Sequence, residues 1–304
     1  MNNNWIIEKK YANARLDKFL VEQLPTESRS KLQKKIAAGG VTVNDVAVNK
    51  HHFLNVGDVV KMIEVEEQAV DIQADAQDIP ILYEDDAIVV IDKPVGVLVH
   101  PVPHRKQWTL VDWILERYPE VAGVGEDDVR PGIVHRLDRE VSGVLLICKT
   151  AEAHHSIKQQ FMKRIVKKDY RAIVYGVPSL PSDVIKFGIA HSKTKQGKMA
   201  AKPEHEAAKD AWTEFDVIEA KHNRYALLAV RIKTGRTHQI RAHLAAIDHP
   251  VVGDTIYMSK HYRGQKPAPR LFLHALNLEI IHPTTGEKIA FEAPLPSAFA
   301  EFLG

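Results

Sequence analysis

The chain has 304 residues, 45% of them hydrophobic and 26% charged, which is ordinary for a globular protein with one large and one small domain. Its formal net charge is only +2, so any affinity for a polyanion has to come from local basic patches. The single cysteine excludes intramolecular disulfide bonds, and no run approaches the roughly 18 apolar residues of a membrane span. Since the N-terminus also lacks a signal-peptide pattern, we expect a cytoplasmic protein.

Residues 13–64 form the first predicted unit. The apolar residues of 16–20 have the spacing of a short helix, and a second helix is expected over 29–38. Residues 41–48 read as two strands around an Asn-Asp turn, and 56–60 as a further turn and strand. The sequence therefore predicts a small helix-helix-hairpin domain.

Basic side chains gather in this first unit. Residues 15–63 contain eight Lys or Arg against five Asp or Glu. The order of elements, with Arg15-Leu16-Asp17 and Ser28-Arg29-Ser30-Lys31, resembles the RNA-binding module named after the fourth small-subunit ribosomal protein. The resemblance implies phosphate contacts that position an RNA without reading its sequence. The side chains predicted to make them are Arg15, Arg29, Lys31, Lys34 and Lys35.

Residues 65–80 are acidic and contain no basic residue. A segment of this kind buries little, so we predict a linker that lets the first unit move independently of residues 81–304.

Residues 81–304 alternate predicted strands with short helices. Strands are expected over 87–92, 144–148, 168–176, 211–219, 225–233 and 271–275. Helices are expected after three capping threonines, Thr109, Thr150 and Thr237. The polar stretch 191–209 reads as an exposed loop.

Asp138 lies at the centre of a charged stretch, His135-Arg136-Leu137-Asp138-Arg139, that precedes a buried strand. Because opposite charges favour an ionised carboxyl group, Arg136 and Arg139 indicate an anionic Asp138, fit to act as a nucleophile, base or metal ligand. The alternative interpretation is a charged turn that caps strand and helix ends.

The motif His135–Asp138, followed by Ser142-Gly143 and an aliphatic run, resembles the signature of the RluA-type pseudouridine synthases, which isomerise uridine in structured RNA. The stretches 87–101, 168–176, 234–254 and 271–275 resemble further motifs of this family. The resemblance implies Asp138 as the catalytic aspartate, Tyr170 as the active-site tyrosine and Arg241 as an arginine near the acid. Val141 stands where the family usually has threonine.

The resemblance also implies contacts to the RNA. Arg136 corresponds to the residue that enters the space left by the extruded base, and Leu273 is expected beside that base. Other polar side chains of the motifs, His135, Arg236, His238 and Gln239, are predicted to contact RNA as well.

Isomerisation of uridine gains and loses no atoms, so it requires neither a metal nor a nucleotide. The sequence agrees, because it contains no G-x-x-x-x-G-K, no complete G-x-G-x-x-G and no C-x-x-C. His238 and His243 are five apart, a spacing that converges poorly on a metal. We therefore predict no cofactor and no metal site.

The sequence thus predicts an α+β protein whose mixed, mainly antiparallel sheet is flanked by helices, the architecture of this family. Its expected function is site-specific formation of pseudouridine in ribosomal large-subunit RNA, with transfer RNA as the alternative substrate. We expect a monomer that has RNA as its partner and does not bind membranes. Two other classes stay open: an inactive RNA-binding ribosome-assembly factor, and a hydrolase that uses Asp138 and histidines around a metal.

Overall fold

The computed structural model describes residues 4–25, 32, 35–36, 40–49, 51–62, 78–101, 107–126, 129–192, 198–202, 208–262 and 268–304. The chain separates into two compact units, Met1–Asp71 and Ile72–Gly304, which are described one at a time. This division falls within the predicted acidic linker 65–80, of which residues 65–77 lie outside the described part.

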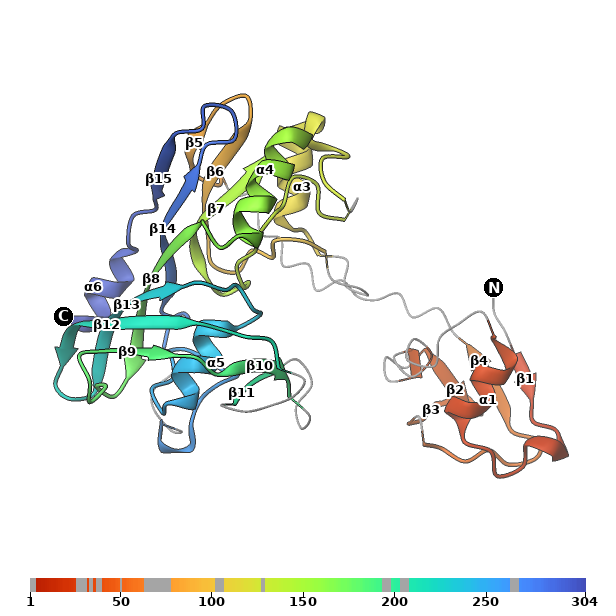
Figure 1. Ribbon diagram of the computed structural model, residues 1–304. Coiled ribbons are helices and arrows are strands. Elements are labelled where there is room, and N and C mark those ends of the chain that lie inside the picture. Colours follow the sequence, from red (N-terminus) through yellow and green to blue (C-terminus); the bar gives the residue numbers. More distant parts are fainter. Residues whose placement is uncertain are drawn as a thin grey trace. The chain divides into compact units, whose positions relative to one another are not determined.

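The N-terminal unit is a four-stranded antiparallel sheet packed against a helix (Figure 1). The strands, in sheet order, are β1 (Asn4–Ile6), β4 (Val59–Met62), β2 (Val41–Val43) and β3 (Val46–Ala47). A short 3-10 helix, η1 (Lys9–Tyr11), precedes α1 (Leu16–Gln23). The apolar residues of α1 join the strand side chains in a small core of their own.

Two details of this unit match the sequence pattern. Asn44 and Asp45, which connect β2 to β3, both have positive φ, as a two-residue hairpin turn requires. Of the helix predicted over 29–38, the structure describes only Leu32, Lys35 and Ile36, which are helical, with Leu32 and Ile36 buried.

The larger unit is built on a nine-stranded sheet. The strands run in the order β5-β6-β7-β14-β8-β13-β12-β9, with β15 also paired to β14. Their bounds are β5 (Ile81–Glu84), β6 (Ile88–Lys93), β7 (Ser142–Cys148), β8 (Lys167–Tyr175), β9 (Ser182–Ile185), β12 (Thr213–Lys221), β13 (Tyr225–Ile232), β14 (Leu273–Ile281) and β15 (Lys288–Glu292). Every pairing is antiparallel except that of β7 with β14, so the predicted mixed, mainly antiparallel sheet is confirmed.

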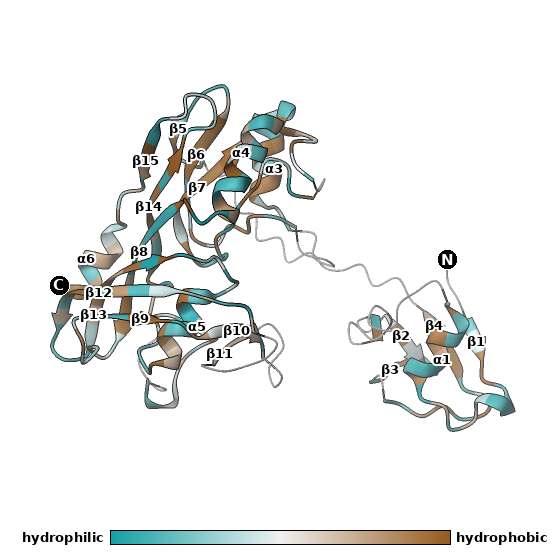
Figure 2. Ribbon diagram, in the orientation of Figure 1, coloured by the Kyte–Doolittle hydropathy of each residue, from teal (hydrophilic) through white to brown (hydrophobic). Residues whose placement is uncertain are grey.

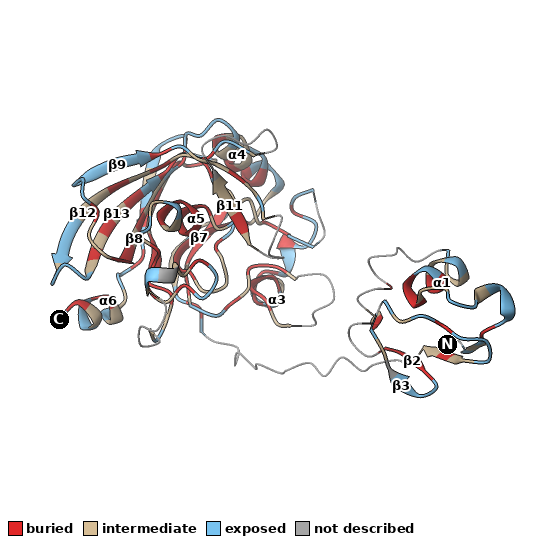
Figure 3. Cartoon of the chain, turned by 90° about the horizontal axis from the view of Figure 1, so that it is seen from below, coloured by how far each residue is buried: buried red, intermediate tan, exposed pale blue. Residues whose placement is uncertain are grey.

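Helices cover both faces of this sheet (Figure 1). The apolar residues of α3 (Leu110–Arg117) and α5 (Gln239–Ala246) pack on one face together with Val89, Leu145 and Ala172. The other face packs against α4 (Ala151–Met162) at one end and α6 (Ser297–Leu303) at the other. Figure 2 shows β6 and β7 mostly brown, and Figure 3 shows the interior strands in red and the edge strand β9 in pale blue.

The capping predictions hold at two of three positions. Thr109 forms a capping box with Asp112 at the start of α3, and Thr150 Oγ1 accepts from the Ala153 amide at the start of α4. The prediction for Thr237 is wrong, because the N-cap of α5 is one residue later. It is His238, which has a left-handed backbone and makes no capping hydrogen bond with its side chain. Across the described helices, none is long and apolar enough to cross a bilayer.

The prediction of an exposed loop over 191–209 is also wrong in part. Strand β10 (Gly188–His191) pairs with β11 (Met199–Lys202), and Met199 is buried. The lysine-rich composition hid the strand, because β11 is only four residues long and takes its stability from packing against α5.

The parallel contact between β7 and β14 is short and depends on Gly143. It pairs His274 with Ser142 and Ala275 with Gly143, and Ser142 Oγ lies 2.8 Å from His274 Nδ1. Gly143 has a φ of +116°, and a Cβ placed on it would lie 2.1 Å from the Ala275 carbonyl oxygen. Glycine at this position therefore fixes how closely the two strands approach, five residues before β7 ends in buried Cys148.

We expect Gly143→Ala to lower the free energy of unfolding by about 3 kcal/mol or more, since it adds a backbone clash to an unfavourable φ. Chemical denaturation followed by circular dichroism measures this loss. Gly286→Ala is the matched control, because Gly286 has a φ of +74° with nothing within 4 Å of an added Cβ. A loss no larger than the control's would contradict the role of close packing at Gly143.

Candidate active site

Asp138 and Arg241 meet although 103 residues separate them in the sequence. Asp138 lies in the turn before β7, and its side chain is 15% exposed. Arg241, on α5, is 2% exposed and donates from Nη1 to Asp138 Oδ2 at 3.0 Å. The pair places one partly accessible carboxylate against one buried guanidinium.

Asp254 fixes the other side of the same guanidinium. Arg241 donates from Nε to Asp254 Oδ2 at 2.7 Å and from Nη2 to Oδ1 at 3.0 Å, the planar two-point geometry that only arginine forms. Burial by itself would lower the pKa of Arg241, but the hydrogen bonds and charges of Asp254 and Asp138 raise it. The guanidinium is therefore a permanent, oriented cation.

The turn that carries Asp254 is itself tightly constrained. Asp254 Oδ1 also accepts from the amides of Ile256 and Tyr257, at 2.8 and 3.0 Å. Gly253 has a φ of +81°, and a Cβ there would lie 1.9 Å from the carbonyl oxygen of Arg270. Asp254 was not predicted from the sequence as a site residue, although Gly253-Asp254 ends the motif of residues 234–254.

The arginines next to Asp138 in sequence have other partners. Arg139 Nε donates to Glu140 Oε1 at 3.1 Å, and Arg136 Nη1 lies 3.2 Å from His100 Nε2. Within the described residues neither pairs with Asp138. The charge of Asp138 still acts on Arg136, but the hydrogen bond to the carboxylate comes from Arg241 on α5.

Tyr170 lines a cavity of ≈ 90 Å³ together with Asp138, Arg241 and Leu273. It lies on β8, on the face of the sheet that packs against α3 and α5, and is 8% exposed. Burial, with a smaller effect of the Asp138 charge, raises the pKa of the Tyr170 phenol. The ring is thus available at the cavity wall while its hydroxyl stays protonated.

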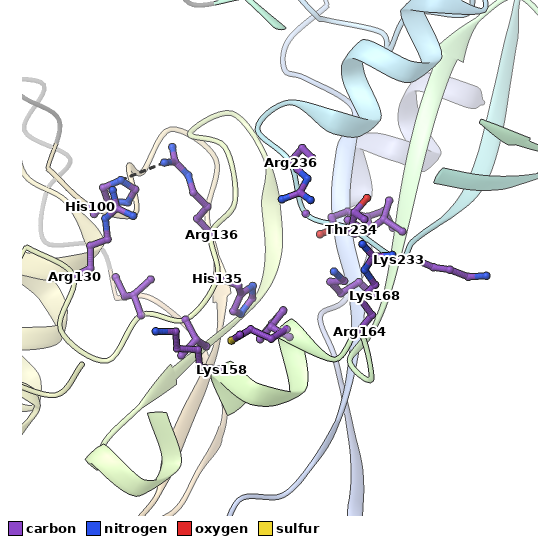
Figure 4. A pocket seen from close by; sticks show the side chains of 17 residues that line it. His100, Arg130, His135, Arg136, Lys158, Arg164, Lys168, Lys233, Thr234 and Arg236 are labelled. Atoms are coloured by element: carbon purple, nitrogen blue, oxygen red, sulfur yellow. Dashed lines mark hydrogen bonds between the residues drawn. The ribbon is translucent and has the colours of Figure 1, made fainter. Parts of the chain in front are cut away.

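A larger cavity of ≈ 500 Å³ adjoins the first and shares Arg136, Tyr170, Ile232, Gly235 and Arg236 with it (Figure 4). Its charged lining is entirely basic, with Arg130, Arg136, Lys158, Arg164, Lys168, Lys233 and Arg236. In Figure 4, Lys168 and Lys233 lie at one side, and Arg130, Arg136 and His100 at the other. The lining favours a polyanionic ligand.

Two of the predicted RNA contacts are engaged within the protein. His135 Nε2 accepts from the Leu146 amide at 2.9 Å, its ring stacks on Phe161, and burial lowers its pKa to about 3. The side-chain amide of Gln239 is fully bonded. Its Oε1 accepts from Thr234 Oγ1 and the Arg236 backbone amide, and its Nε2 donates to the Trp212 carbonyl and Thr213 Oγ1. Both side chains therefore hold the motif turns in place.

His238 links the pair of Asp138 and Arg241 to β11. Its Nδ1 lies 3.1 Å from the Tyr257 hydroxyl, which accepts from the Met199 amide at 2.8 Å. Its Nε2 is 3.8 Å from Asp138 Oδ2. The left-handed backbone of His238, with a φ of 54°, is a strained conformation held by these contacts.

Lys93 binds the turn that follows Asp138, through the Arg139 carbonyl, and was not predicted from the sequence as a site residue. Its buried ammonium donates to the carbonyl oxygens of Pro94, Val97 and Arg139, at 2.7, 3.0 and 3.3 Å. Burial lowers the pKa of Lys93 to about 7, although Glu140 and Asp138 oppose that shift. The Lys-Pro pair after a buried strand was the available signal.

The remaining predicted contacts are only partly described. Leu273 and Arg236 both line the smaller cavity. In the N-terminal unit, Arg15 forms a two-point ion pair with buried Asp17, at 3.0 and 2.9 Å. Arg29, Lys31 and Lys34 lie outside the described residues, and Lys35 is helical. In the part of the chain that is described, no cluster of three or more His, Cys, Asp or Glu residues could hold a metal ion.

Comparison with known proteins places this site in a family. Residues 87–246 match the model for RNA pseudouridylate synthase, and residues 14–60 match the S4 domain. The solved human RNA pseudouridylate synthase domain containing 1 is similar in fold, with a TM-score of 0.59 at 26% identity over 73% of this chain and 88% of that chain.

Curated relatives match along nearly the whole chain. An uncharacterized RNA pseudouridine synthase of Synechocystis is 38% identical over 95% of this chain and 88% of its own length. The ribosomal large subunit pseudouridine synthase D of Haemophilus influenzae is 34% identical, with 98% and 92% covered, and that of Pseudomonas aeruginosa is 36% identical, with 94% and 89% covered.

The fold and these matches define an RNA-modifying isomerase with an N-terminal S4 domain. The chain belongs to the RNA pseudouridylate synthase family and is an RNA pseudouridine synthase.

We expect Asp254→Asn to lower the free energy of unfolding by about 3 kcal/mol, because the buried Arg241 loses the carboxylate that accepts two of its hydrogen bonds. The control is Asp216→Asn, since Asp216 pairs with Arg231 at the surface, where both side chains are more than 40% exposed. Its loss should stay below about 1 kcal/mol. Equal losses in urea denaturation would show that Asp254 does not anchor Arg241.

Proposed function

We propose that this enzyme isomerises a specific uridine in large-subunit ribosomal RNA, with Asp138 as the catalytic carboxylate and no cofactor. The observation that carries the proposal is the position of Asp138, in a small cavity with Oδ2 held by Arg241 at 3.0 Å. Within the described residues no hydrogen bond reaches Oδ1, which leaves that oxygen for the substrate.

The reaction breaks the bond between N1 and C1′, turns the uracil and forms a bond between C5 and C1′. A proton leaves C5 and N1 gains one, so atoms and electrons balance without an external reagent. Asp138 serves this sequence either by attacking C1′ or by removing a proton of the ribose. Both routes use a carboxylate aimed at the sugar, and the two-sided grip of Asp138 and Asp254 on Arg241 supplies that aim.

Tyr170 provides the flat wall of the cavity. Stacking of a base on an aromatic ring contributes roughly 1 to 3 kcal/mol. Because its raised pKa keeps the phenol protonated, the hydroxyl can accept the C5 proton only while passing on its own. Leu273, in the same lining, gives the base an apolar neighbour.

The substrate class rests on three supports. Several relatives are named as ribosomal large subunit pseudouridine synthases. The larger cavity has a basic lining without an acid among the residues that form it. The N-terminal unit matches the S4 domain. Transfer RNA is the alternative substrate, and we assign the enzyme to the cytoplasm, as a monomer.

The proposal predicts that wild-type protein releases tritium from large-subunit RNA labelled at C5 of uridine, in the presence of a chelator. Asp138→Asn should reduce release by at least about a thousandfold, since the reacting anion is gone. Glu140→Gln is the matched control, because Glu140 lies two residues away with a 41% exposed side chain. Its release should stay within about tenfold of wild type.

The outcome of the tritium-release assay distinguishes the proposed function from its alternatives. Release from transfer RNA alone would shift the substrate, and loss with chelator would contradict cofactor-free chemistry. RNA binding without release from any cellular RNA would favour an inactive assembly factor.

Tyr170 variants separate the ring from the hydroxyl. In an Asp138→Asn background, Tyr170→Phe should bind RNA as tightly as Tyr170, whereas Tyr170→Ala should weaken binding roughly five- to a hundredfold. With Asp138 intact, a Tyr170→Phe enzyme that binds RNA but does not release tritium would assign the proton relay to the hydroxyl. Equal binding by the alanine and phenylalanine variants would contradict the stacking role.

A further inference from the structure

Lys168 occupies a distinctive position in the larger cavity. It lies on β8 two residues before Tyr170, so alternation along the strand turns both side chains to the same face, with their Cα atoms roughly 7 Å apart. Both line the larger cavity, and Tyr170 also lines the smaller one. Lys168 therefore stands next to the expected position of the target base.

The surroundings of Lys168 hold its ammonium without neutralising it. Its Nζ lies 5.6 Å from the centroid of the Phe161 ring and 4.0 Å from a Cβ placed on Gly235. No acidic side chain among the described residues forms an ion pair with it. The site thus combines a partly buried cation, an aromatic neighbour and an open wall.

Neighbouring lysines differ in this respect. Lys158, in the same cavity, pairs with Glu126, and Lys233 lies 3.2 Å from Glu214 and 3.8 Å from the Trp212 ring centroid. Lys167, the preceding residue on β8, pairs with Glu279 at 2.9 Å. A cation kept without an anion in a partly buried place costs stability, which a bound anion would recover.

We propose that Lys168 is a substrate-binding residue, which binds the phosphodiester adjoining the target uridine in the larger cavity. The inference rests on the proposed function, because it takes RNA as the ligand. A phosphate between successive nucleotides carries one negative charge, which complements one ammonium group.

The protonation of Lys168 makes this contact dependent on pH. Burial lowers the pKa of Lys168 to about 8. A bound phosphate stabilises the protonated form, so the contact is complete below pH 8 and RNA affinity falls as the pH rises through 8. Arginine stays charged throughout this range, so Lys168→Arg should remove this component of the pH dependence.

The test measures equilibrium binding of large-subunit ribosomal RNA by full-length protein in an Asp138→Asn background. Lys168→Met should weaken binding about tenfold or more at pH 7 and reduce the slope of log affinity against log salt by about 0.7 to 0.9. Lys168→Arg should restore affinity and hold it at pH 9, where the lysine protein weakens. Lys167→Met, on the opposite face of the strand, is the matched control with unchanged affinity, slope and pH profile.

In an Asp138-intact background, Lys168→Met should raise KM for tritium release about tenfold with kcat within about threefold. A melting temperature of Lys168→Met that is no lower than that of the control excludes a merely structural effect. Affinity, salt slope and pH profile that match the control would overturn the proposal, and so would a protein that binds no RNA. If Lys168→Met weakens RNA binding but the wild-type protein releases no tritium, the phosphate contact is upheld and the proposed catalysis is refuted.

Discussion

The buried ion pair between Arg241 and Asp254 is the interaction on which the site depends. Two hydrogen bonds to Asp254 fix the plane of the guanidinium, and its remaining nitrogen, Nη1, donates to Asp138. Since a guanidinium is planar, the position of Asp254 determines the direction from which Asp138 is held. The turn at Gly253 and the two amides that bind Asp254 thus constrain the Asp138 carboxylate through Arg241.

The sheet brings the chemistry together from distant parts of the sequence. Asp138 precedes β7, Tyr170 lies on β8, and Arg241 lies in the first turn of α5, the helix that follows β13. All three lie on the side of the sheet that α3 and α5 cover, and they line the same small cavity. The charged lining of the adjoining larger cavity is entirely basic, whereas the small cavity contains the Asp138 carboxylate.

Much of this was readable in the sequence, because strong periodicity and turn signals marked the strands, two of the helix caps and the motif of Asp138. The partners of the motif residues were not readable. Arg136 and Arg139 stood beside Asp138 in sequence yet bind elsewhere, and Asp254 carried no sign that its carboxylate would be buried. Such pairings are set by how distant turns meet across the sheet, and the same tertiary context made a strand of residues 199–202 within the lysine-rich stretch 191–209.

The short parallel contact of β7 and β14 has a consequence for the working enzyme. Asp138 belongs to the half of the sheet before this seam, whereas Tyr170 and Arg241 belong to the half beyond it, and only two residue pairs join the halves along the backbone. The hydrogen bond from Arg241 to Asp138 therefore also connects the two halves of the sheet across this seam. Opening of this seam would separate Asp138 from Arg241, so the geometry of the proposed active site depends on the two halves staying closed.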